Sequence, residues 1–210
     1  MELGSSAAND AKSDQTDAKK GERCRLRDSG SAEGSRLIVE QQGSNRTIGS
    51  RSFGATFRLA GPKGERMVAA ADYFTLPRQS LRMENVLAPD ELLTHVILPA
   101  PGAVKSGHYE VRYKESHDWP IAFATVLLTM NGANVQSARV VIGAVAPIPW
   151  RSPAAEQALA GKAITEETAA AAAEAALKDA RPLSQNAYKV DVAKVAVKRA
   201  ILRAAGIKVA

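Results

Sequence analysis

The residues best suited to chemistry lie in the segment Tyr109–Lys114, where ionic and apolar side chains alternate. Successive side chains of an extended strand point to opposite faces, so Glu110, Arg112 and Lys114 would share one face. Two neighbouring cations on a strand suit an anionic or electron-rich ligand. The same pattern fits a solvent-exposed face laced by ion pairs, which is the commoner meaning of such residues. From these residues alone, both interpretations stay open.

Other reactive residue types are sparse. The single cysteine, Cys24, excludes an internal disulfide and a multi-cysteine metal site. The histidines His95, His108 and His117 lack metal-ligand spacing, so we expect solvated or hydrogen-bonded side chains. Nucleophile-elbow, Walker and dinucleotide-loop motifs are absent, and "TIGS" at Thr47–Ser50 is too short to predict a phosphate loop. The residues themselves therefore predict no catalytic residue and no metal site.

Composition limits the function classes further. The net charge is +6, but the basic residues are not gathered with aromatics as in nucleic-acid-binding modules, so no nucleic-acid partner is expected. No apolar run reaches the length of a membrane span, and no signal-peptide core is visible at the N-terminus. The expected location is the cytoplasm.

The N-terminal segment 1–52 differs from the rest of the chain. Its nine basic and eight acidic residues nearly cancel, and its only short apolar run is "LIV" at Leu37–Val39. Such a segment buries too little apolar surface to offset the entropy of ordering it. We predict a disordered tail over residues 1–52, with order beginning near Phe53.

Residues 53–100 are expected to form a β-hairpin and one further strand. Two short apolar runs flank "GPKG", which is a turn signal. A leucine-rich and β-branched run then ends at Leu98, before Pro99. The elbow Pro99–Ala103 is the predicted domain boundary.

Residues 101–210 are expected to form an α+β domain. Strands are predicted over Tyr109–Lys114, Ile121–Met130 and Ala138–Val145, with Asn131-Gly132 as the hairpin turn between the last two. Together they make a three-stranded antiparallel sheet, and the helices that follow in the sequence would cover one of its faces.

Helix-capping residues divide the rest of the chain. Ser152 and Pro153 begin a helix that ends at Gly161. Thr165 is the N-cap of the next helix, without the glutamate or glutamine of a capping box. A last helix is predicted over residues 187–204, with apolar residues at helical spacing and most of its cations off that face.

Four blocks of the sequence resemble one known family. They are "ATFRLAGPKGERMVAAADYFTLPR", "VLAPDELLTHVILPAPG", "YEVRYKESHDWPIAFATV" and "ARVVIGAVAPIPWRSPAAEQALAGK". From about Phe53 onwards the chain resembles the C-terminal part of the FAD-binding, or medium, subunit of molybdenum hydroxylases, the xanthine dehydrogenase and aerobic carbon monoxide dehydrogenase family. The resemblance implies that residues 53–100 are the end of a FAD-binding domain and its crossover, and residues 101–210 the C-terminal domain.

The same resemblance implies an oxidoreductase component. In such a subunit FAD receives electrons from iron–sulfur clusters and passes them to NAD or another acceptor. The partners would be a molybdopterin-containing large subunit and an iron–sulfur small subunit. The alternative is a non-enzymatic α+β remnant or a subunit-interaction domain.

One part of the family pattern is missing. The family holds the FAD diphosphate on glycine-rich loops, whose backbone amides present several donors with no side chain in the way. The first such loop is absent, and "TIGS" matches only part of the second. We therefore expect a shortened or frame-disrupted gene product that binds FAD poorly by itself.

Four positions match flavin-facing residues of the family. The resemblance places Leu93 against the flavin ring and Arg112 near the isoalloxazine, where positive charge would stabilise a reduced flavin. Lys114 is the alternative to Arg112 if the alignment moves by one pleat. Arg78 corresponds to a basic residue near the flavin approach.

Overall fold

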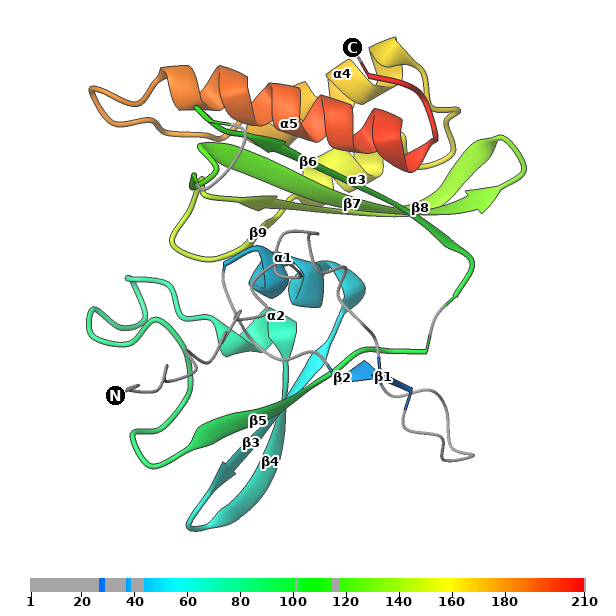
Figure 1. The fold of residues 1–210 in the computed structure, drawn as a ribbon. Helices are drawn as coiled ribbons and strands as arrows, with labels where there is room; N and C mark the ends of the chain where they lie inside the picture. The colour runs from blue at the N-terminus through cyan, green and yellow to red at the C-terminus, as the bar shows by residue number, and fades with distance from the viewer. Residues whose placement is uncertain (1–26, 29–36, 39–43, 101, 115–117, 210) are drawn as a thin grey trace, which may run out of the picture.

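The computed structural model describes residues 27–28, 37–38, 44–100, 102–114 and 118–209. These residues form two antiparallel sheets that lie one above the other in Figure 1, with the C-terminal helices above the upper sheet. None of the helices in these ranges has both the length and the apolar character needed to cross a membrane. The predicted α+β class is confirmed.

The lower sheet has five strands in the order β1-β2-β5-β3-β4. The strands are β1 (Arg27–Asp28), β2 (Leu37–Ile38), β3 (Thr56–Gly61), β4 (Gly64–Ala69) and β5 (Leu92–Ile97). The "GPKG" prediction is confirmed, because β3 and β4 form a hairpin in which Gly61 is opposite Gly64. Gly64 has φ +112°, which favours glycine at this turn.

A small apolar cluster holds this sheet to the short helix α2 (Ala70–Tyr73). Its buried residues are Ala55, Phe57, Leu59, Ala70, Tyr73 and Val96. The rings of Phe57 and Tyr73 meet edge to face, with their centroids 4.7 Å apart. Hydrophobic burial here involves fewer side chains than in the upper sheet.

The upper sheet has the order β6-β7-β8-β9. Its strands are β6 (Val104–Val111), β7 (Ala122–Asn131), β8 (Asn134–Gly143) and β9 (Trp150–Arg151). Each of the three predicted strands has a counterpart with shifted bounds, the turn at Gly132, which has φ +60°, is confirmed, and the two-residue β9 adds an edge. After β8, Ala144 has φ +60° in an elbow that leads to β9.

Three helices cover one face of the upper sheet (Figure 1): α3 (Pro153–Leu159), α4 (Glu166–Leu177) and α5 (Tyr188–Ala204). As predicted, Ser152 caps α3 by accepting a hydrogen bond from the Ala155 amide. The prediction for α4 was wrong in one detail. Thr168 accepts a hydrogen bond from the Thr165 amide, and Thr165 accepts one from the Thr168 amide, so threonine completes a capping box without a glutamate.

A large apolar core joins these helices to β7 and β8. Helix α5 also packs closely on β6, where Gly107 is the contact point. A Cβ atom built on Gly107 would lie 2.1 Å from the Ala200 carbonyl oxygen. Only glycine permits this approach of helix and strand.

The opposite face of the upper sheet contacts helix α1 (Ser44–Phe53). Most of the predicted tail falls outside the described residues, but residues 44–52 are helical, so ordered structure begins before Phe53. The Arg139 guanidinium donates a hydrogen bond to the buried Ser52 carbonyl at 3.0 Å. This tertiary contact, rather than apolar content, ties the segment to the fold. Thr47–Ser50 lies inside α1 and is not a loop.

Candidate functional site

The candidate site lies at the C-terminal end of β6. We use the name β6-end cluster for His108, Glu110, Arg112, Lys114 and Asp118. The predicted strand Tyr109–Lys114 was misplaced, because β6 runs from Val104 to Val111. Arg112 and Lys114 therefore follow the strand instead of standing on it.

Glu110 connects the first part of the cluster. His108 Nε2 lies 2.8 Å from Glu110 Oε1, and its Nδ1 lies 2.9 Å from Thr125 Oγ1 on β7. The Arg112 guanidinium donates a hydrogen bond to the other carboxylate oxygen of Glu110. Because His108 is directly opposite Thr125 in the ladder, the sheet register fixes this chain of contacts. The side chains of His108, Glu110 and Arg112 are thus held in one order along the strand end.

Electrostatics keep Glu110 ionised. Its burial alone would raise the pKa of the carboxyl, but hydrogen bonds from His108 and Arg112 outweigh that effect and lower the pKa below its usual range. Glu110 therefore remains an acceptor for Arg112 at neutral pH. The pair fixes the guanidinium, whose side chain is still 31% exposed.

Asp118 shapes the second part of the cluster. Its Oδ2 accepts hydrogen bonds from the amides of Tyr113 and Lys114, both at 3.1 Å, and its Oδ1 accepts one from the Trp119 amide at 2.9 Å. These bonds replace ladder bonds, which explains why β6 ends at Val111. Asp118 thus caps three local amides, and the neighbouring Trp119 is 75% exposed.

A cavity of about 470 Å³ lies beside the cluster. Arg203 of α5 completes its basic lining: its guanidinium donates a hydrogen bond to the His108 carbonyl at 3.1 Å and lies 4.6 Å from the centre of the Tyr109 ring. Arg112, Lys114 and Arg203 thus line one cavity with a single carboxylate, Glu110, among its lining side chains. The arrangement suits an electron-rich or anionic planar group.

Leu93 lies elsewhere. On β5 it is opposite Leu59, and it packs partly buried against the apolar cluster of the lower sheet. It does not line the β6-end cavity. Its apolar character serves the lower core in the described structure.

Arg78 lies apart from both the β6-end cluster and Leu93. It is exposed in the loop after α2 and lines a different cavity of about 440 Å³, together with Arg51, Trp150 and Arg151. The structure therefore brings together Arg112 and Lys114, but neither Leu93 nor Arg78 joins them.

Sequence reasoning missed two members of the site. His108 was expected to be solvated or hydrogen-bonded, which is confirmed, but its link to Glu110 was not foreseen. The alternation that predicted a shared face for Glu110 and Arg112 extends back to His108, so that signal was available. Arg203 comes from another element, 95 residues from His108, and local spacing cannot reveal it.

Comparison with known proteins identifies the family to which the C-terminal domain belongs. Residues 107–204 match the family described as "CO dehydrogenase flavoprotein C-terminal domain". This chain carries a CO dehydrogenase flavoprotein C-terminal domain. The match begins inside β6, so the whole β6-end cluster lies within the flavoprotein domain, whereas Leu93 and Arg78 precede it.

Two relatives and one solved structure support this assignment. The chain is 32% identical to the carbon monoxide dehydrogenase medium chain of Hydrogenophaga pseudoflava over 81% of its own length and 64% of that protein. It is 27% identical to the aldehyde oxidoreductase FAD-binding subunit PaoB of Escherichia coli K12 over 76% and 48%. A chain of quinoline 2-oxidoreductase from Pseudomonas putida 86 superimposes with a TM-score of 0.70 at 29% identity, covering 78% of this chain and 56% of the other.

These findings confirm the predicted resemblance to medium subunits of molybdenum hydroxylases. The chain spans 64% and 48% of the lengths of these two relatives. Among the residues that the structure describes, no group of three histidine, cysteine or acidic side chains is placed to hold a metal ion.

Proposed function

We propose that this chain acts as a FAD-binding medium subunit of a molybdenum hydroxylase, in which the β6-end cluster faces the flavin ring. The supporting observation is that a cavity lined by Arg112, Lys114 and Arg203 lies inside the matched flavoprotein domain. When bound, FAD would supply the redox chemistry, taking electrons from iron–sulfur clusters and passing them to NAD or another acceptor.

The protein's own residues would bind and orient the ring. Arg112 places positive charge at the cavity, and Glu110 holds its guanidinium in position. The Lys114 amide donates a hydrogen bond to Asp118, which fixes the backbone position from which the Lys114 side chain extends. Positive charge beside the ring favours a reduced, anionic flavin over the neutral oxidised form.

From the family resemblance we also propose that Leu93 lies against the flavin ring and Arg78 near the flavin approach, and neither of them lines the β6-end cavity. Leu93 is partly buried on β5, and Arg78 is exposed beside Trp150, so each offers a surface of the appropriate type. FAD is an extended dinucleotide, so one bound molecule can contact the β6-end cluster, Leu93 and Arg78 at the same time.

The fit to FAD is good for the ring and poor for the diphosphate. The ring needs a cavity with positive charge, which the β6-end cluster provides. The diphosphate needs a loop of free amides, but "TIGS", the best candidate in the sequence, lies within α1. We therefore propose that the chain alone binds FAD weakly.

The expected partners are a molybdopterin-containing large subunit and an iron–sulfur small subunit, with the assembled complex in the cytoplasm. The supporting evidence is that the chain resembles a "medium chain" of carbon monoxide dehydrogenase, a name that implies further chains. A second candidate function, a subunit-interaction domain without redox activity, is favoured by the exposed aromatic side chains of Tyr113 and Trp119 beside the cluster.

A flavin titration distinguishes the two functions. We expect FAD fluorescence to be quenched saturably by the full chain, with a flavin absorption band near ~450 nm. The change Arg112→Gln should weaken binding about tenfold, because it removes one charge-assisted contact. Arg82→Gln, on an exposed arginine outside the cavity, is the matched control. Quenching that never saturates, or equal loss in both variants, would favour the interaction domain.

A further inference from the structure

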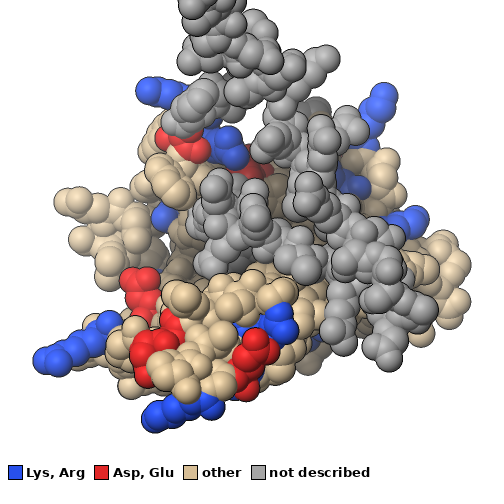
Figure 2. Space-filling model, turned by 60° about the horizontal axis from the view of Figure 1, so that its bottom comes forward, with Lys and Arg blue, Asp and Glu red and all other residues tan. Residues whose placement is uncertain are grey.

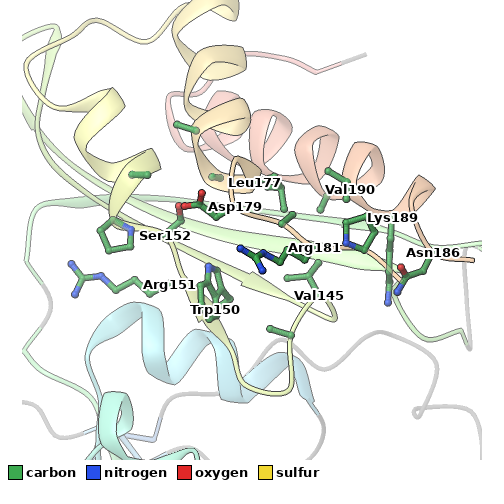
Figure 3. Close-up of a pocket in the computed structure, with 18 residues that line it drawn as sticks. Val145, Trp150, Arg151, Ser152, Leu177, Asp179, Arg181, Asn186, Lys189 and Val190 are labelled. Atoms are coloured by element: carbon green, nitrogen blue, oxygen red, sulfur yellow. The ribbon is translucent and has the colours of Figure 1, made fainter. Parts of the chain in front are cut away.

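A further cavity of the C-terminal domain lies between the helices and the elbow after β8 (Figure 3). We call it the elbow cavity. Its walls come from the elbow and β9, the start of α3, the end of α4, and the loop that leads into α5. Its volume is about 340 Å³. This lies at the lower end of the range for small-molecule sites, which begins at roughly 300 Å³.

The walls of the elbow cavity are mainly apolar. Val145, Leu177 and Val190 approach it from three different segments, and the indole of Trp150 lies along one side (Figure 3). The indole is 44% exposed, although it is large and apolar. Such a surface gains free energy when an apolar ring covers it.

Three of the charged groups around the cavity have no side-chain partner among the described residues. Arg181, Lys189 and Asp179 all line it, and the described residues offer none of them a side-chain hydrogen bond or ion pair. Figure 3 shows the Arg181 guanidinium reaching in beside Trp150, with Lys189 at the far end from Asp179. The local excess is therefore one positive charge. One anionic group would find a partner here.

A polar donor lies near the cations. Asn186 lines the cavity, and its Oδ1 already accepts a hydrogen bond from the Leu183 amide at 2.6 Å. Its NH₂ group is left to donate a hydrogen bond into the cavity.

The wall that faces these groups is preorganised. Arg151 donates two hydrogen bonds to Glu156, at 2.8 and 2.7 Å, and Glu156 also accepts one from the Val140 amide at 3.1 Å. Ser152 caps α3 and is buried. Because Glu156 neutralises Arg151, the free cations of the cavity are those on the α4–α5 side. Little ordering of the wall would be needed on binding.

We propose that the elbow cavity binds a small cyclic monocarboxylate, with its ring against Trp150 and its carboxylate on Arg181. Lys189 and Asn186 lie at the other end of the elbow cavity. The positive charge of Lys189 and the NH₂ group of Asn186 disfavour a cationic ligand there. The site requires no flavin and no partner subunit, so it is separate from the function proposed above.

The test uses Trp150 as a reporter. The chain has two tryptophans, so Trp119→Phe leaves Trp150 alone, and the exposed position of Trp119 makes the change mild. The probes are cyclohexanecarboxylate and its neutral counterpart cyclohexylmethanol, neither of which absorbs with tryptophan. We expect the acid to change Trp150 emission saturably, with a Kd about tenfold below that of the alcohol, since one charge-assisted contact distinguishes them. Calorimetry on the unmodified chain gives a second reading.

Two variants separate binding in the cavity from loose ion pairing. Arg181→Gln should raise the Kd for the acid about tenfold and leave the alcohol unchanged, whereas Arg82→Gln should change neither. Ala180→Phe, at an exposed position that lines the cavity, should weaken both probes. Equal affinity for acid and alcohol, emission that does not saturate, or the same result for Arg181→Gln and Arg82→Gln would overturn the proposal. All measurements are made without FAD, so failure of the flavin proposal does not affect them.

Discussion

The two sheets of the molecule are stabilised in different ways. The upper sheet shares a broad apolar core with α3, α4 and α5, whereas the lower sheet has a small cluster around Phe57, Leu59 and Tyr73. The lower sheet also carries ion pairs at its surface, Arg58 with Glu65 and Arg66 with Glu91. Figure 2 views the molecule from this end and shows blue and red side chains interspersed. The two sheets therefore differ mainly in how many apolar side chains each one buries.

The largest effect is expected from Gly107→Ala in the upper sheet. The new methyl would meet the α5 backbone at Ala200, so helix and strand must separate. We expect a loss of about 3 kcal/mol of unfolding free energy, the upper range for overpacking. Gly102→Ala is the control, because its Cβ would have only an ordinary contact with Val104. Chemical denaturation measures both, and equal stability of the two variants would mean that α5 does not lie so close to β6.

Matched leucines compare the two cores directly. Leu128 in the upper core and Leu59 in the lower cluster are both fully buried. Either change to alanine should cost about 2–4 kcal/mol. Hydrogen exchange should show that the two variants open different regions of the molecule. Leu128→Ala should lower amide protection in α3 to α5, whereas Leu59→Ala should lower it in β3 to β5 alone. Loss of protection in the helices of Leu59→Ala would show that the sheets unfold as one unit.

Acid should affect the lower sheet through Glu91. Hydrogen bonds from Arg66 and then from the Ala88 amide lower the pKa of Glu91 from 4.5 to about 2. The stabilisation is therefore complete above the unfolded-state pKa and disappears as pH falls from about 4.5 through about 2. In Glu91→Gln, the fall in thermal stability over this range should be smaller. Identical pH profiles for the variant and the parent chain would contradict this assignment.

The smallest effect on stability is expected at the β6-end cluster. Arg112→Gln removes a partly exposed ion pair to Glu110, which contributes about 1 kcal/mol or less. Thermal denaturation should therefore barely change, while flavin binding falls. A large drop in stability would mean that Arg112 is chiefly structural.

The sequence predicted those parts of the fold that depend on local chemistry. The turns at Gly64 and Gly132 and the start of α3 at Pro153 all follow from residue types at fixed offsets. Helix α1 was missed, because it has no apolar stripe and is held by Arg139 from another element. Strand β6 was misplaced at both ends: its pairing with the long β7 extends it to Val104, and Asp118 ends it at Val111.

The candidate site was only partly predictable for the same reason. Alternation placed Glu110 and Arg112 on one face, and the structure joins them. Spacing along the chain contains no information that Arg203 would come to this cavity or that Leu93 and Arg78 would lie outside it. Those placements depend on how α5 and the two sheets pack.

Above all, we propose that this chain holds the flavin ring and not the diphosphate. Comparing the affinities of riboflavin and FAD for the full chain tests it most directly. We predict that they differ by less than about threefold, since the phosphates and adenosine of FAD would find no amide loop to bind. FAD binding that is about a hundredfold tighter than riboflavin binding, or no binding of riboflavin at all, would contradict the claim.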